Sequence, residues 1–146
     1  MKLNITVFLV LGLFIGCKSA HKSTSYDGKS GATKIVNTIH YPQEKHLKNV
    51  KQLTFGGDNA EAYWSYDGKK LVFQRTSIKD GIPCDQIFVG TVPVSPSEPF
   101  TYTMVSTGKG RTTCAYFTYD NKHIIYASTH LANGDCPPVP DRAKYG

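Results

Sequence analysis

The chain has 146 residues, of which 17 are Lys or Arg and 11 are Asp or Glu, so its formal net charge is +6. Hydrophobic residues make up 40% of the sequence and charged residues 19%, a balance that excludes an entirely disordered chain. Four cysteines are too few for a small domain held together mainly by disulfides. Length alone predicts one folded domain.

The N-terminus has the pattern of an export signal. Lys2 precedes an apolar run over residues 5–15, which is shorter than the roughly 20 residues that a membrane-spanning helix needs. The run ends on Gly16-Cys17, and this ending resembles the lipobox of bacterial lipoproteins. The resemblance implies a cleaved signal over residues 1–16, a lipid on Cys17 and a place at the outer membrane of the cell envelope. An ordinary secretory signal and a retained anchor helix stay open, because Phe14 stands where the lipobox usually has Leu.

The segment after Cys17 has the composition of a linker. Residues 18–34 are rich in Ser, Lys and Gly and contain one large apolar side chain, Tyr26. Such a segment buries too little surface to offset the loss of chain entropy. We therefore expect residues 17–34 to be a lipidated cysteine and a flexible tether, and residues 35–146 to be the folded part.

From residue 35 onward the sequence has the pattern of short strands separated by turns. Apolar residues keep no helical spacing over any long window, so we expect no helix. Gly, Pro, Asp and Asn separate the apolar runs, which predicts an all-β fold of antiparallel strands. The expected strands cover residues 51–55, 61–65, 70–76, 86–92, 100–105, 114–118 and 123–128.

Two segments repeat one another at a distance of 53 residues. Each has an aromatic residue, a hydroxyl residue, Tyr, Asp, a turn residue and Lys, followed by an apolar strand. Each copy therefore predicts a strand, a tight turn and a second strand. The matched residues are Trp64, Ser65, Tyr66, Asp67, Gly68 and Lys69 in the first copy, and Phe117, Thr118, Tyr119, Asp120, Asn121 and Lys122 in the second.

These copies, with Leu53-Thr54 before the first, resemble the repeat of TolB-type (WD-like) β-propellers over about residues 50–130. The family pattern is Leu-Thr, a gap, and Trp-Ser-Pro-Asp-Gly-Lys before an apolar strand; Tyr66 and Tyr119 replace its Pro. The resemblance implies four-stranded antiparallel blades, of which about one and a half are present. Because a propeller needs about four to eight blades, we expect an incomplete part of a longer propeller. A small β domain that pairs with other chains is the alternative.

A fainter echo of the same motif occurs at residues 25–29. It is not followed by an apolar strand, so a degenerate blade and a part of the tether both stay open. At the matched positions of the two clear copies, the aromatic residues Trp64, Phe73, Phe117 and Tyr126 are expected to pack between blades.

Besides Cys17, the cysteines are Cys84, Cys114 and Cys136. An exported chain meets an oxidising compartment, in which disulfides persist. Three thiols cannot all pair. The sequence leaves open a bridge from Cys84 to Cys114 between the blades, a bridge from Cys114 to Cys136, and a Cys136 whose partner is missing from an incomplete chain.

The sequence predicts neither catalysis nor a cofactor. It contains no Gly-x-Ser-x-Gly elbow, no phosphate-binding glycine loop and no His-Glu-x-x-His, so we expect no catalytic residue and no enzyme activity. The spacing of His123, His130, Asp135 and Cys136 fits no compact zinc pattern, so we expect no metal. The basic residues are scattered and the chain is expected to be exported, which predicts no nucleic-acid partner.

The resemblance implies that the chain is a scaffold of the cell envelope that binds a protein partner. The lipid on Cys17 would anchor it to the membrane. Two other functions stay open. Similar blades form the non-catalytic propeller of prolyl-oligopeptidase-like serine peptidases, in which a catalytic domain would follow. A propeller channel can also bind a carbohydrate or another small ligand.

Overall fold

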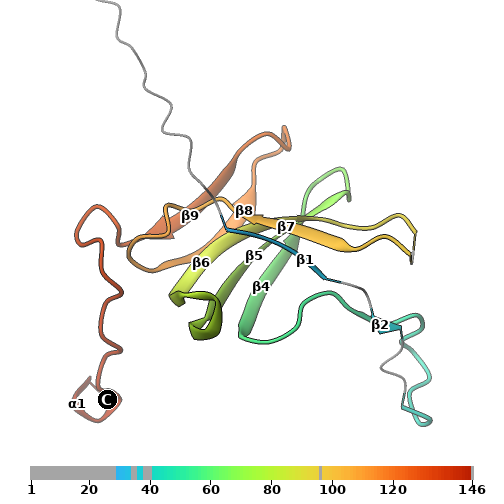
Figure 1. The fold of residues 1–146 in the computed structure, drawn as a ribbon, viewed down its shortest axis with the longest axis horizontal. Coiled ribbons are helices and arrows are strands. Elements are labelled where there is room, and N and C mark those ends of the chain that lie inside the picture. The colour runs from blue at the N-terminus through green and yellow to red at the C-terminus, as the bar shows by residue number, and fades with distance from the viewer. Residues whose placement is uncertain (1–28, 34–35, 38–40, 96, 146) are drawn as a thin grey trace, which may run out of the picture.

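The computed structural model describes residues 29–33, 36–37, 41–95 and 97–145. The expected signal segment, Cys17 and most of the echo at residues 25–29 lie outside them. The described chain is mostly antiparallel β-sheet, so the all-β class is confirmed (Figure 1). The elements are β1 (Ser30–Thr33), β2 (Val36–Asn37), β3 (Lys51–Gln52), β4 (Asp58–Trp64), β5 (Lys70–Ser77), the 3-10 turn η1 (Ile78–Asp80), β6 (Ile82–Thr91), β7 (Phe100–Met104), β8 (Thr112–Phe117), β9 (Ile124–Ser128) and α1 (Arg142–Tyr145).

A five-stranded sheet in the order β1-β7-β6-β5-β4 is the centre of the fold. Strands β4 to β7 follow one another along the chain and pair antiparallel with their sequence neighbours. They are the four consecutive strands expected between residues 61 and 105, and they form a meander (Figure 1). The described residues form no closed ring of such sheets, so the assignment of a propeller blade stays a prediction.

One face of this meander carries an aromatic core. Every second residue of a strand points to the same face, so side chains of β5 and β6 meet those of β7 there. The ring centroid of Phe73 lies 5.8 Å from that of Phe88 and 5.8 Å from that of Tyr102. Gly90 leaves space for the ring of Phe100, which would collide with any Cβ at that position. The buried members are Leu71, Phe73, Ile82, Phe88, Phe100 and Met104.

The hairpin β8–β9 packs on the opposite face of the meander. Val72 and Ile87, both fully buried, form a second cluster there with Ala115 and Phe117 of β8. Strands β5 and β6 are therefore covered on both faces, which explains why apolar residues run almost continuously through their centres. Removal of this apolar surface from water holds the two sheets together.

Strand β1 pairs with the outer edge of β7, where Ser30 lies opposite Thr103 and Thr33 opposite Phe100. These residues belong to the segment 17–34 that we expected to be a tether, and its last described part is instead a strand. Main-chain hydrogen bonds hold this strand and require no large side chain. A strand of Ser, Gly, Ala and Thr therefore escaped a prediction that depends on apolar content.

The outer elements depart from the prediction in two further places. Strand β3 takes up only two of the residues expected at 51–55, and it pairs with β2. Helix α1 was not expected, and it is a single short turn whose Ala143 amide donates a 2.9 Å hydrogen bond to the Asp141 carboxylate. After β9 the chain first stays beside the loop before β8, where the Gly110 amide donates a 2.7 Å hydrogen bond to the Gly134 carbonyl. It then runs away from the sheets to α1 (Figure 1).

Candidate protein-interaction site

The two sequence repeats fold into hairpins of the same register. In the hairpin β4–β5, Tyr63 lies opposite Val72. In the hairpin β8–β9, the residues 53 positions further on, Tyr116 and Ile125, also lie opposite one another. The repeat seen in the sequence is therefore a repeat of backbone structure.

The unusual backbone conformations repeat as well. Both hairpins contain a register shift, at which Glu61 and Cys114 have φ angles of 49° and 53°. Such left-handed values are uncommon for residues other than glycine and mark a bulge in each first strand. Gly57 and Gly110, also 53 residues apart, have φ angles of 67° and 61°. Gly57 lies against Thr76 and Ser77 at the end of β5, and Gly110 lies against Thr129 and His130 just after β9.

The turn of the first repeat is held by Ser65 and Asp67. The Ser65 hydroxyl donates to Asp67 Oδ1 at 2.7 Å, and the Lys69 amide donates to the same oxygen at 3.2 Å. The Lys70 amide donates to Ser65 Oγ at 2.9 Å. Gly68 takes the left-handed position of the turn, with φ 69°. The Ser65 hydroxyl, together with the Lys69 amide, keeps the pKa of Asp67 below 3.8.

The turn of the second repeat uses the same contacts. The Thr118 hydroxyl donates to Asp120 Oδ1, and the Lys122 amide donates to that oxygen at 3.0 Å. Asn121 takes the left-handed position with φ 57°, which Asn tolerates better than other side chains. The hydrogen bond from Thr118, then that from Lys122 and the nearby His123, lowers the pKa of Asp120 to about 2.

Equivalent residues of the two repeats touch one another. The rings of Tyr63 and Tyr116 stack with their centroids 4.1 Å apart, and the rings of Tyr66 and Tyr119 meet edge to face at 5.2 Å. The Asn121 side-chain oxygen accepts a hydrogen bond at 3.3 Å from the first turn. A hydrogen bond to the Tyr116 side chain, followed by the unfavourable approach of two phenolate charges, raises the pKa of Tyr63 to about 12. The repeats are therefore stacked in register.

The aromatic residues expected to pack between blades differ in exposure. Phe117 is 8% exposed and Phe73 4%, and Tyr126 packs against the second buried cluster. Trp64, which matches Phe117, is 57% exposed. The side of the first repeat that carries Trp64 is thus open where the same side of the second repeat is covered.

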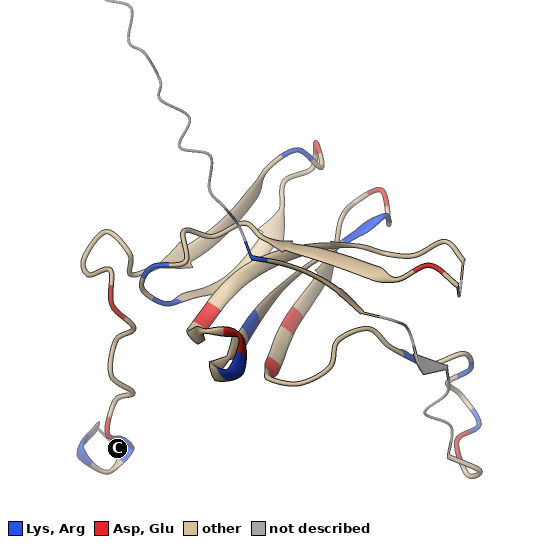
Figure 2. Ribbon diagram, viewed as in Figure 1, with Lys and Arg blue, Asp and Glu red and all other residues tan. Residues whose placement is uncertain are grey.

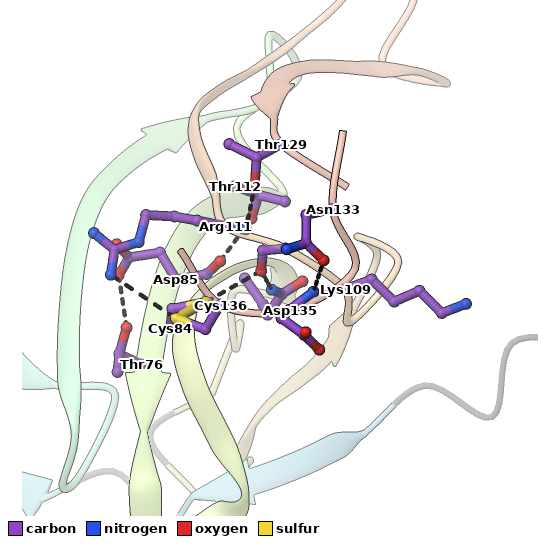
Figure 3. The surroundings of a disulfide bond; sticks show 12 residues. Thr76, Cys84, Asp85, Lys109, Arg111, Thr112, Thr129, Asn133, Asp135 and Cys136 are labelled. Carbon is purple, nitrogen blue, oxygen red and sulfur yellow. Dashed lines mark hydrogen bonds between the residues drawn. A yellow bond between two sulfur atoms is a disulfide. The ribbon is translucent and has the colours of Figure 1, made fainter. Parts of the chain in front are cut away.

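A disulfide joins Cys84 of β6 to Cys136, in the segment after β9, with 5.9 Å between their Cα atoms (Figure 3). Cys84 is buried, and the Arg111 guanidinium lies 3.9 Å from the sulfur of Cys136. Cys114 is exposed and unpaired. Neither pairing left open by the sequence is the one in the structure, since both required Cys114.

The other candidates from the sequence are spread over the hairpins. His123 Nδ1 lies 3.0 Å from the Asp120 carboxylate, and His130 Nδ1 lies 2.7 Å from the Ser128 hydroxyl. Cys136 is taken up by the disulfide. Over residues 29–33, 36–37, 41–95 and 97–145, no three His, Cys, Asp or Glu side chains gather as metal ligands would. No helix in this part of the chain is long and apolar enough to cross a membrane.

A polar cluster around the buried Arg75 was not predicted from the sequence. Arg75 is almost fully buried, and its guanidinium pairs with Asp80 at 2.7 Å, while Ser77 donates to the same carboxylate oxygen at 2.8 Å. Lys29 donates to two backbone carbonyls of the β5–β6 turn, at 2.6 and 2.7 Å, and Tyr102 lies 6.0 Å from the guanidinium. The alternation of β5 could have found Arg75, since it is in phase with the buried Leu71 and Phe73. The cluster ties the start of β1 to the β5–β6 turn.

The fold and the site define an all-β protein with two stacked hairpin repeats and exposed aromatic residues along them. No protein-family model, curated protein or solved structure matches the chain.

Proposed function

We propose that this chain is a lipid-anchored protein of the cell envelope, held at the outer membrane through Cys17, that acts as a non-catalytic TolB-like β-propeller scaffold for an envelope protein. The observation that carries the proposal is a pair of exposed rings at one edge of the stacked repeats. Tyr66 and Tyr119 are 66% and 82% exposed, and each occupies the same place in its turn.

This edge, formed by the two turns, has the composition of a protein-binding surface. Tyr offers a large apolar area with few rotatable bonds and a hydroxyl group that can form hydrogen bonds. Asp67 and Lys69 in one turn, and Asp120 and Lys122 in the other, bring both signs of charge to the same edge (Figure 2). A polar rim around aromatic side chains favours a specific partner over general adhesion.

The anchor rests on the sequence pattern that ends at Gly16-Cys17. From Cys17 to Ser30, where β1 begins, the chain can span at most about 45 Å. A lipid on Cys17 would thus keep the sheets within that distance of the membrane. An envelope protein at the same membrane would then meet the edge that carries Tyr66 and Tyr119 at a raised effective concentration.

The test places a photo-crosslinking amino acid at position 119 of the full chain in bacterial cells, with position 131 as the matched control. Leu131 is 92% exposed and lies away from the two turns. Irradiation should join the position-119 variant, and not the position-131 variant, to another envelope protein. In Cys17→Ala, incorporation of radiolabelled palmitate and the cross-link should both be lost. Equal cross-linking at the two positions contradicts the scaffold, and palmitate retained in Cys17→Ala contradicts the anchor.

A further inference from the structure

The contact between the two repeats uses one side of each hairpin. On the first repeat, Val72 and the ring of Tyr63 are covered by the second repeat. Their counterparts on the second repeat, Ile125 and Tyr116, are 68% and 48% exposed. Strand alternation puts Ile125 and the exposed Ala127 on the side of β8–β9 that faces away from the meander. Beside them Tyr116, whose ring stacks on Tyr63, stays half exposed. We call Tyr116, Ile125 and Ala127 the hairpin face.

The opposite side of the first repeat is also open. In the second repeat, Ala115 and Phe117 are 2% and 8% exposed because the meander covers them. Their counterparts Ala62 and Trp64 are exposed, Trp64 by 57%. A cavity of about 310 Å³ opens beside them, lined among others by Leu53, Ala60, Ala62, Leu71, Phe73 and Phe100. We call Ala62, Trp64 and this cavity the groove face.

The two faces match one another by construction. Ile125 and Tyr116 occupy the positions that Val72 and Tyr63 have in the first repeat. Ala62 and Trp64 of the groove face occupy the positions of Ala115 and Phe117, which pack against Val72. None of the residues that define the hairpin face is charged, and among the described residues that line the cavity Glu61 alone is charged. Joining the faces would therefore bury apolar surface with little desolvation of charge.

We infer that a second copy of this chain seats its hairpin face in the groove face of the first, so that copies associate head to tail. This inference rests on the proposed scaffold function and deepens it, because it names a second copy of the chain as a partner that adds further hairpins to the two stacked repeats. Both halves of the contact lie on this chain, and the contact continues the interface already made between β4, β5 and β8. The contact between the two repeats within one chain therefore shows how a second copy would pack. The contact is heterologous, with a different surface on each side.

The test uses two variants that each remove one face. Ile125→Glu puts a charge on the hairpin face, and Ala62→Glu fills the groove face; both positions are exposed, so the fold should stand. Val94→Glu, at a 96% exposed loop position, is the matched control. The full chain and its variants are purified in the same mild detergent, and their masses are followed against concentration by analytical ultracentrifugation.

The wild-type chain and Val94→Glu should form oligomers that grow with concentration. Each Glu variant alone should raise the apparent dissociation constant at least about tenfold, the effect of burying an unpaired charge. An equimolar mixture of the two variants should form dimers and nothing larger, because one intact hairpin face meets one intact groove face. A wild-type chain that stays monomeric, or a mixture that forms no dimer, overturns the inference. The cross-link at position 119 to another protein is independent of this result, so failure of the inference and failure of the scaffold are distinguishable.

Discussion

Asp67 and Asp120 hold equivalent turns with the same set of contacts. Each carboxylate accepts a hydrogen bond from the hydroxyl group two residues before it and from the amide two residues after it. Both contacts favour the ionised carboxylate, so both pKa values are lowered. Asp120 has in addition the ring of His123 at 3.0 Å. The turn role of both residues was predictable from the sequence, because Asp before Gly or Asn is a strong turn signal.

Acid should therefore weaken the second turn. The folded-state pKa of Asp120 is about 2, below the ordinary value of 3.8, so its stabilisation is complete above about pH 4 and is lost as the pH falls towards 2. In Asp120→Asn, the free energy of unfolding should change less over that interval, since the group no longer titrates. Urea unfolding followed by circular dichroism at stepped pH measures the slope.

The matched control for this change is Val94→Asn, at a 96% exposed loop position, which adds the same side chain and removes no titratable group. It should keep the pH slope of the wild-type chain. A slope in Asp120→Asn equal to that of the wild type would show that the Asp120 carboxylate contributes nothing to stability.

At the scale of elements, the hairpins were predictable and the edges were not. Turn residues and alternating apolar runs placed β4 to β9 near their observed positions, because both signals are local. Strand β1 has no apolar pattern and depends on the free edge of β7. The pairing of Cys84 with Cys136 depends on the path of the chain after β9. That segment has no regular sequence pattern that would predict how close the two cysteines come.

The disulfide should stabilise the fold by tying β6 to the chain that follows β9. It closes a loop with a sequence separation of 52 residues, for which loop entropy predicts about 4 kcal/mol. Cys136→Ser should therefore lower the free energy of unfolding by up to about 4 kcal/mol. Cys114→Ser, which removes the exposed free thiol, should change it little. Guanidinium unfolding without reductant measures both, and equal losses would contradict the observed pairing.

At the scale of the whole molecule, two similar hairpins have different surroundings. The sequence predicted that Trp64 and Phe117 both pack between repeats, because they occupy the same place in the motif. The second hairpin is covered by the meander and the first is open on the corresponding side. Motif position thus predicted backbone conformation correctly, whereas burial depended on which neighbour each repeat has.

This difference should decide the cost of truncating each aromatic side chain. Phe117→Ala should lower the free energy of unfolding by about 3 kcal/mol or more, because it leaves a cavity in the cluster with Val72, Ile87 and Ala115. Trp64→Ala removes a larger side chain, yet it should cost under about 1 kcal/mol, because Trp64 is 57% exposed. Urea unfolding of both variants in dilute solution measures the two losses. Because the positions are equivalent in backbone structure, strand propensity largely cancels and the comparison isolates packing between the repeats. Equal losses would mean that β8–β9 does not pack on the meander in solution.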